Sequence, residues 1–185
     1  MDKYSILVFA HVASVIVWIG VGSTVALAAL YAQRGRDQVV LERLGGWVGW
    51  LAPRVFAPSA LAALGFGIAA AHAGHWPRLF FFHLGEAAFA ISFLLTVLFR
   101  LPLLRRARRG NIRPDRYARL TLSLALVELT VLFLAVWDMV AKPTSSNTAT
   151  LATGGAILAL AVLASITVGL SGRSKPNLDL VEIAD

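Results

Sequence analysis

Five long apolar stretches constrain the fold of this chain more than any other feature of its sequence. They cover residues 4–32, 50–73, 79–104, 120–141 and 149–171. A helix needs about 20 mostly apolar residues to cross the hydrocarbon core of a bilayer, and every stretch reaches that length. The sequence therefore predicts an all-α integral membrane protein, a bundle of five transmembrane helices.

The composition and the spacing of the stretches favour a single membrane domain. Of the 185 residues, 58% are hydrophobic and 15% are charged, whereas soluble domains hold about 45–50% apolar and about 25% charged residues. No long linker separates the stretches, so we expect one domain over residues 1–171 and a polar cytoplasmic tail over 172–185. The fifth stretch has no ionisable residue, which favours a four-helix core with a peripheral fifth helix.

The basic residues predict the orientation of the bundle. Lys and Arg are enriched in cytoplasmic loops of membrane proteins. Fourteen of the seventeen fall in the first loop, the third loop and the tail, and three fall on the alternate side. We therefore expect a multi-pass protein of the inner (plasma) membrane with its N-terminus outside and its C-terminus in the cytoplasm. Because topology explains the positive charge, we expect the lipid bilayer as partner, with anionic head groups as a secondary ligand, and no nucleic acid.

A histidine lies deep in the first stretch, in the pattern His11-x6-Trp18-x-Gly20. Such a residue is costly in a membrane unless it has a partner or a function. The predicted topology places all four histidines in the outer half of the membrane or at its outer surface, where His72 and His75 fit ordinary interfacial positions. The chain has no cysteine, so any metal or haem iron must be held by other side chains.

The third and fourth predicted helices supply further polar candidates. His83 and Glu86 are three residues apart and share a helix face. Glu128, Asp138 and Lys142 follow one stripe of the fourth helix, with Glu128 near mid-membrane. Because polar side chains in a membrane usually face the bundle interior, we expect an outward-facing polar pocket between the first, third and fourth helices. Glu128 should be protonated or paired with a hydroxyl of a neighbouring helix.

Each of these features also has a purely structural interpretation. His11 could hydrogen-bond Glu86 or a backbone carbonyl and fix the helix packing. His83 and Glu86 could form a local pair, and Asp138 and Lys142, four residues apart, could form an ion pair at the helix end. The sequence leaves these alternatives open.

Two motifs resemble known families of membrane proteins. His11-x6-Trp18-x-Gly20 resembles the opening of CopD-type copper-resistance proteins and of the oxygen-independent protoporphyrinogen oxidase family, a haem-binding helical bundle. The segment Asp138-Met139-Val140-Ala141-Lys142-Pro143 resembles the fourth-helix ending of the domain-of-unknown-function 2269 family of predicted integral membrane proteins, a resemblance that extends over nearly the whole chain. The oxidase resemblance implies that His11 ligates haem.

A b-type haem or redox bundle is the first functional hypothesis. His11 and His83 would ligate one iron from two helices. Glu86 and Ser14 would accept hydrogen bonds from the second nitrogen of each imidazole, and Trp18 would exclude water from the macrocycle.

Two other classes of function remain open. One is a permease for a metal ion or small solute, in which Glu128 and Asp138 mark the path. The other is a non-catalytic accessory subunit that packs against a larger membrane complex, or a homo-oligomer, with its polar residues joining helices. The sequence assigns no reaction and does not decide whether the protein is an enzyme.

Overall fold

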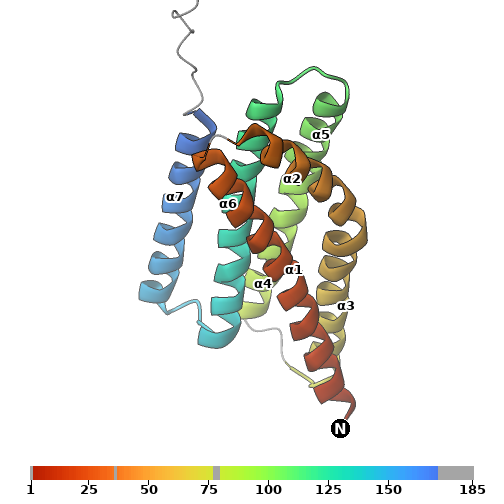
Figure 1. Ribbon diagram of the computed structural model, residues 1–185. Coiled ribbons are helices and arrows are strands. Elements are labelled where there is room, and N and C mark those ends of the chain that lie inside the picture. Colours follow the sequence, from red (N-terminus) through yellow and green to blue (C-terminus); the bar gives the residue numbers. More distant parts are fainter. Residues whose placement is uncertain (1, 36, 77–79, 171–185) are drawn as a thin grey trace, which may run out of the picture.

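The computed structural model describes residues 2–35, 37–76 and 80–170, and within these ranges the regular elements are all helices (Figure 1). The helices are α1 (Lys3–Arg34), α2 (Gln38–Leu51), α3 (Ala57–Ala73), α4 (Phe80–Leu94), α5 (Leu101–Arg108), α6 (Pro114–Ala141) and α7 (Thr148–Leu170). Two π-helical turns, η1 (Ala52–Phe56) and η2 (Leu95–Arg100), join α2 to α3 and α4 to α5.

Five helical runs in the described part are long and apolar enough to cross a membrane. They are Lys3–Arg34, Val39–Ala73, Phe80–Arg108, Arg116–Ala141 and Thr148–Gly169. The predicted all-α class and the predicted number of long apolar helices are therefore confirmed. The second run begins earlier than residue 50, because α2, η1 and α3 form one continuous helical path.

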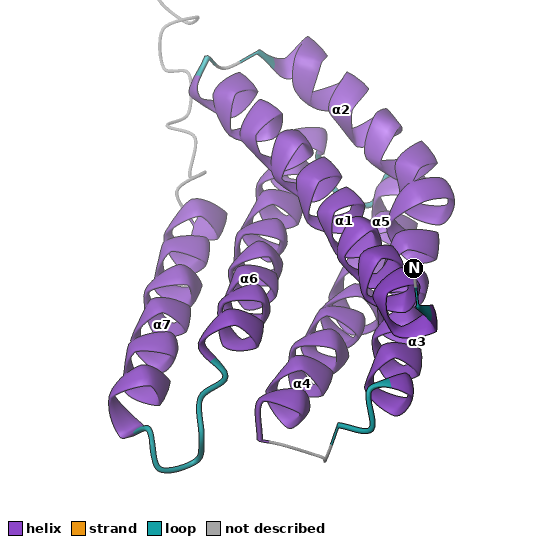
Figure 2. Cartoon of the chain, turned by 90° about the horizontal axis from the view of Figure 1, so that it is seen from below, coloured by secondary structure: helices purple, strands orange, loops and turns teal. Residues whose placement is uncertain are grey.

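The helices form a bundle in which α6 contacts α1, α4 and α7, while α7 packs on α6 at the edge (Figures 1 and 2). The N-terminus, the start of α4 and the end of α6 lie at the lower end of Figure 1, and α2 and α5 lie at the upper end. An open apolar groove separates the lower halves of α6 and α7 and is lined by Thr130, Phe133, Leu134, Trp137 and Ile157.

Small residues on α3 form the seam against α1. Ser59, Ala63 and Ala70 are buried there. Gly67 lies against the imidazole of His11. A side chain added at Gly67 would place its Cβ only 2.9 Å from His11 Nδ1 and 3.0 Å from Cε1. Small residues let two helix backbones approach closely, and here the absent side chain leaves room for a ring from the facing helix.

Proline accounts for both π-helical turns. It lacks a backbone N–H and its ring clashes with the carbonyl four residues earlier, so a locally wider turn relieves the conflict. The η1 turn contains Pro53 and ends before the Ala57–Pro58 pair, and the η2 turn ends before the Leu101–Pro102 pair. At the end of η2 the backbone N–H of Leu101 bonds the carbonyl of Thr96, five residues back. Arg100 is thereby presented toward α6 from the last position of η2.

The α1–α3 seam can be tested with Gly67→Ala. The added methyl meets the His11 ring, so we expect the free energy of unfolding in detergent to fall by about 1–3 kcal/mol, the usual cost of overpacking. Gly65→Ala is the matched control, because its Cβ would have no neighbour within 4 Å and alanine favours a helix. In a His11→Ala background the cost of Gly67→Ala should largely vanish. Equal effects of the two alanine substitutions would contradict this packing.

Candidate functional site

Glu128 is at the centre of a buried polar cluster that joins three elements. Its side chain belongs to α6 and the residue is only 7% exposed. Ser92 Oγ of α4 donates a hydrogen bond to Glu128 Oε1 at 2.6 Å. Arg100 Nη2, from η2, lies 2.5 Å from Glu128 Oε2. The expected hydroxyl partner of Glu128 is thus Ser92, and the carboxylate also has a cationic partner that neutralises it.

Arg100 is not predicted as a site residue from the sequence, because it lies close to the basic residues of the third loop. The sequence nevertheless places Arg100 inside the predicted apolar stretch 79–104, an unusual position for a charged residue. An arginine at such a position needs a partner, and the π-helical turn before Pro102 brings it to Glu128. Tertiary geometry was required to identify which carboxylate it meets.

His11 is held against α3 by its own hydrogen bond. Its Nδ1 lies 2.7 Å from the carbonyl oxygen of Ala63. A carbonyl can only accept, so Nδ1 carries the proton and Nε2 is the ring nitrogen left for a ligand or a proton. Ser14 was the expected acceptor for the imidazole, but Nδ1 bonds the carbonyl of Ala63, and the hydroxyl of Ser14 donates to the carbonyl of Ala10. The backbone-carbonyl alternative for His11 therefore holds in this structure.

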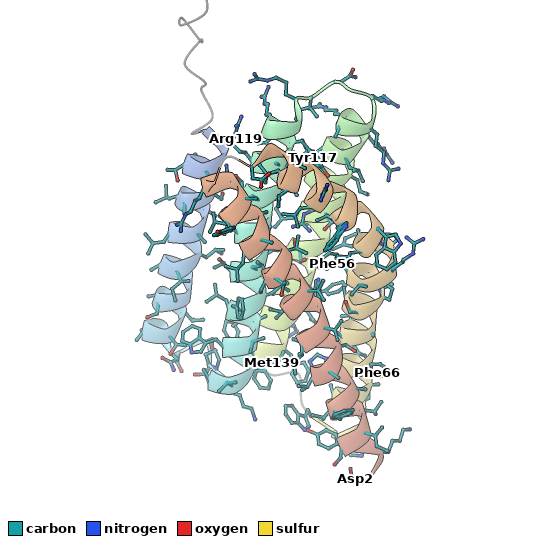
Figure 3. All side chains as sticks on the ribbon, viewed as in Figure 1. Asp2, Phe56, Phe66, Tyr117, Arg119 and Met139 are labelled. Atoms are coloured by element: carbon teal, nitrogen blue, oxygen red, sulfur yellow. The ribbon has the colours of Figure 1, made fainter. Side chains whose placement is uncertain are left out.

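His83 and Glu86 form the expected local pair, with His83 Nδ1 at 3.2 Å from Glu86 Oε2. Their side chains are 54% and 61% exposed. Gly85 faces α6, since a Cβ added there would be 2.7 Å from Met139 Cε of α6. His83 is two residues, just over half a turn, from Gly85. His83 therefore projects from the side of α4 that faces away from α6 (Figure 3 marks Met139).

The two histidines proposed as haem ligands are not brought into one site. His11 lies in the α1–α3 seam, whereas His83 lies on the outward side of α4. Trp18 packs between these helices, with its ring centroid 6.0 Å from that of Phe89 in an edge-to-face contact. These positions do not fit a haem held by both imidazoles between α1 and α4. In the described ranges, no group of three His, Cys, Asp or Glu side chains could hold a metal ion.

Asp138, near the lower end of α6, is buried without a partner. The residue is 5% exposed, and neither carboxylate oxygen has a hydrogen-bond or ion-pair partner in the described part of the chain. Asp138 is nine residues, two and a half turns, from Leu129, which contacts Gly22 of α1. It therefore projects from the side of α6 opposite α1 and shares no pocket with His11.

The expected ion pair between Asp138 and Lys142 does not form. Lys142 ends α6 in the left-handed conformation with φ 45°, and its backbone N–H donates to the carbonyl of Asp138 at 2.8 Å. Its ammonium instead lies 5.1 Å from the ring centroid of Trp76. A cation over an indole face is stabilised by the ring quadrupole, so Lys142 has a partner that is independent of Asp138.

An aromatic cluster at the lower end holds Trp76 in place. The centroid of Trp76 lies 6.4 Å from that of Tyr4, 6.1 Å from Phe81 and 5.9 Å from Phe82. These rings come from α1, from α4 and from the segment after α3, so they tie three parts of the bundle together. The cluster fixes the indole to which Lys142 turns, and it thereby keeps the ammonium away from Asp138.

Comparisons of the chain with protein-family models, with curated proteins and with solved structures found no match. The family resemblances drawn from the His11 and Asp138 motifs stay predictions. Two carboxylates of α6, the paired Glu128 and the bare Asp138, are the features of the site that the geometry itself defines.

The pairing of Arg100 with Glu128 predicts strong coupling in a double-mutant cycle. Arg100→Gln or Glu128→Gln alone should lower the free energy of unfolding by about 2 kcal/mol, because the remaining partner loses a charge-assisted hydrogen bond. The double variant should cost clearly less than the sum of the two. Chemical denaturation in detergent measures all three. Additive losses would contradict a direct pair.

Proposed function

We propose that this chain is a multi-pass membrane protein whose lower end in Figure 1 is outside the cell and whose upper end is cytoplasmic. Five helical runs of membrane-spanning length and apolarity support insertion. The fourteen-to-three distribution of Lys and Arg supports the orientation. The contacts of α7 with α6 support a core of four such runs with α7 as the peripheral fifth.

Within that membrane protein, Asp138 is proposed as the functional group, and its function is to bind and release a proton. The supporting observation is its burial at 5% exposure with neither oxygen partnered. A bare charge at such a site is costly and is normally neutralised, and an unpaired ionisable side chain inside a membrane is a functional candidate by default. Glu128, in contrast, has both Arg100 and Ser92 as partners.

A proton is favoured over a metal ion as the occupant of this site. Hard cations such as Ca²⁺ and Mg²⁺ require about six oxygen ligands, and Asp138 belongs to no group of three His, Cys, Asp or Glu side chains among the described residues that could hold a metal ion. A proton needs only one carboxylate oxygen. The proposal is therefore a proton-coupled membrane protein, in the permease class, that takes up its proton near the outer surface.

The charged groups near Asp138 in the described part of the chain have other partners, so none of them forms an ion pair with its carboxylate. Lys142 has its ammonium on Trp76. The helix α7 contains no ionisable residue. On α4, the exposed side chains of His83 and Glu86 are paired with each other. Uptake of a proton therefore changes the net charge at Asp138 without breaking an existing ion pair.

Labelling with a hydrophobic carbodiimide, which reacts with protonated carboxyl groups, tests this function. In detergent or bilayers at neutral pH we expect the label on Asp138, with less labelling as the pH rises because the ionised carboxylate does not react. Mass spectrometry of peptides locates the label. Asp138→Asn should abolish it. Glu128 serves as the internal control, because its carboxylate is paired with Arg100 and Ser92. A label on Glu128 alone, or one independent of pH, would refute the assignment.

Haem binding is a second candidate, and one observation favours it. The Nδ1–H of His11 is held by the carbonyl of Ala63, which leaves Nε2 as the free nitrogen. Metal-ligating histidines are commonly oriented in this way. In this proposal His11 alone on this chain would ligate the iron, and the group would supply one-electron redox chemistry.

A visible spectrum after haem-replete expression tests the second candidate. A Soret band that is lost in His11→Ala and retained in His72→Ala, an exposed histidine of α3, would support it. A colourless protein would exclude it and leave the Asp138 proposal untouched.

A further inference from the structure

The end of the helical run Phe80–Arg108 carries unpaired positive charge. Arg105, Arg106, Arg108 and Arg109 lie at or just beyond the last turn of α5, and all four are exposed. Within the residues that the structure describes, none of the four has an ion-pair partner. Four like charges within five residues repel one another, so an anionic ligand at this surface would relieve that repulsion.

The same helical run exposes apolar side chains directly beside these arginines. Leu98 is 58% exposed, Phe99 54% and Leu101 41%. In α5, Leu101, Arg105 and Arg108 follow the spacing of four and three residues that places them on one face. This face, named the Leu101 stripe, passes from apolar to cationic along the helix. A phospholipid has the same order, with acyl chains next to a phosphate.

Tryptophans at the same end of the bundle mark the level of a membrane interface. Trp47 and Trp50 of α2 are 68% and 56% exposed, and α2 lies with α5 at the upper end of Figure 1. The Arg54 guanidinium is 4.9 Å from the ring centroid of Trp50. Exposed Trp side chains are typical of the head-group region. The arginines of the Leu101 stripe therefore lie at the depth where lipid phosphates are found.

We propose that the Leu101 stripe binds the phosphate of an anionic phospholipid in the bilayer that surrounds the protein. The guanidinium groups of Arg105 and Arg108 contact the phosphate oxygens, for which their planar fork of donors is suited. The acyl chains lie against Leu101 and the exposed residues before it. This surface is at the opposite end of the bundle from Asp138, and the inference is independent of the proposed proton site.

Thermal unfolding in nanodiscs tests this inference. We expect a higher Tm in discs that contain phosphatidylglycerol than in discs of phosphatidylcholine alone. Arg105→Gln/Arg108→Gln should lose most of this Tm difference. Arg106→Gln/Arg109→Gln is the matched control, because it removes the same charge from the same segment, with Arg106 on a different face of α5 and Arg109 just beyond the end of the helix. Both variants retain most of the fourteen basic residues that orient the chain.

The outcomes distinguish phosphate binding at the Leu101 stripe from a general attraction between basic residues and anionic lipid. A Tm difference that is lost in Arg105→Gln/Arg108→Gln and largely kept in Arg106→Gln/Arg109→Gln supports the site. Equal losses in the two variants, or no Tm difference between the two lipids in the wild type, overturn it. Inorganic phosphate added to phosphatidylcholine discs should give no comparable shift, and an equal shift would also overturn a lipid as the ligand.

Discussion

Neutralising a buried carboxylate is the physical requirement on which this structure depends. Removing an ionised group from water costs several kcal/mol unless a partner compensates for it. Glu128 meets the requirement with Arg100 and Ser92, so the cluster both satisfies the charge and joins α4, η2 and α6. Asp138, ten residues along the same helix, has no such partner. The contrast between these two carboxylates separates a structural role from a proposed functional one.

The imidazole of His11 shows how one residue can serve packing and leave a chemical group available. Its Nδ1–H satisfies the carbonyl of Ala63, and its ring fills the space that Gly67 leaves on α3. This contact fixes the orientation of α1 against α3 and the tautomer of the ring together. His11 packs α1 against α3 without needing a cofactor, and its Nε2 is still available to bind one.

Periodicity and composition were sufficient to predict the helices, but not which side chains meet. The five apolar stretches follow from length and the pairing of His83 with Glu86 follows from spacing. A hydroxyl partner was one of two expectations for Glu128, based on the cost of a bare carboxylate in a membrane. The ion pair with Arg100 depends on a π-helical turn before Pro102, which the pattern of apolar residues does not show. The isolation of Asp138 depends on the left-handed conformation of Lys142 and on Trp76, which is distant in sequence.

The central claim, that Asp138 holds a proton whereas Glu128 is paired with Arg100, is tested most directly by infrared spectroscopy of the protein in bilayers. The account predicts a carbonyl stretch from one buried protonated carboxyl group at neutral pH. This band should persist in Glu128→Gln and disappear in Asp138→Asn. A band that survives in Asp138→Asn, or that is lost only in Glu128→Gln, would contradict the account.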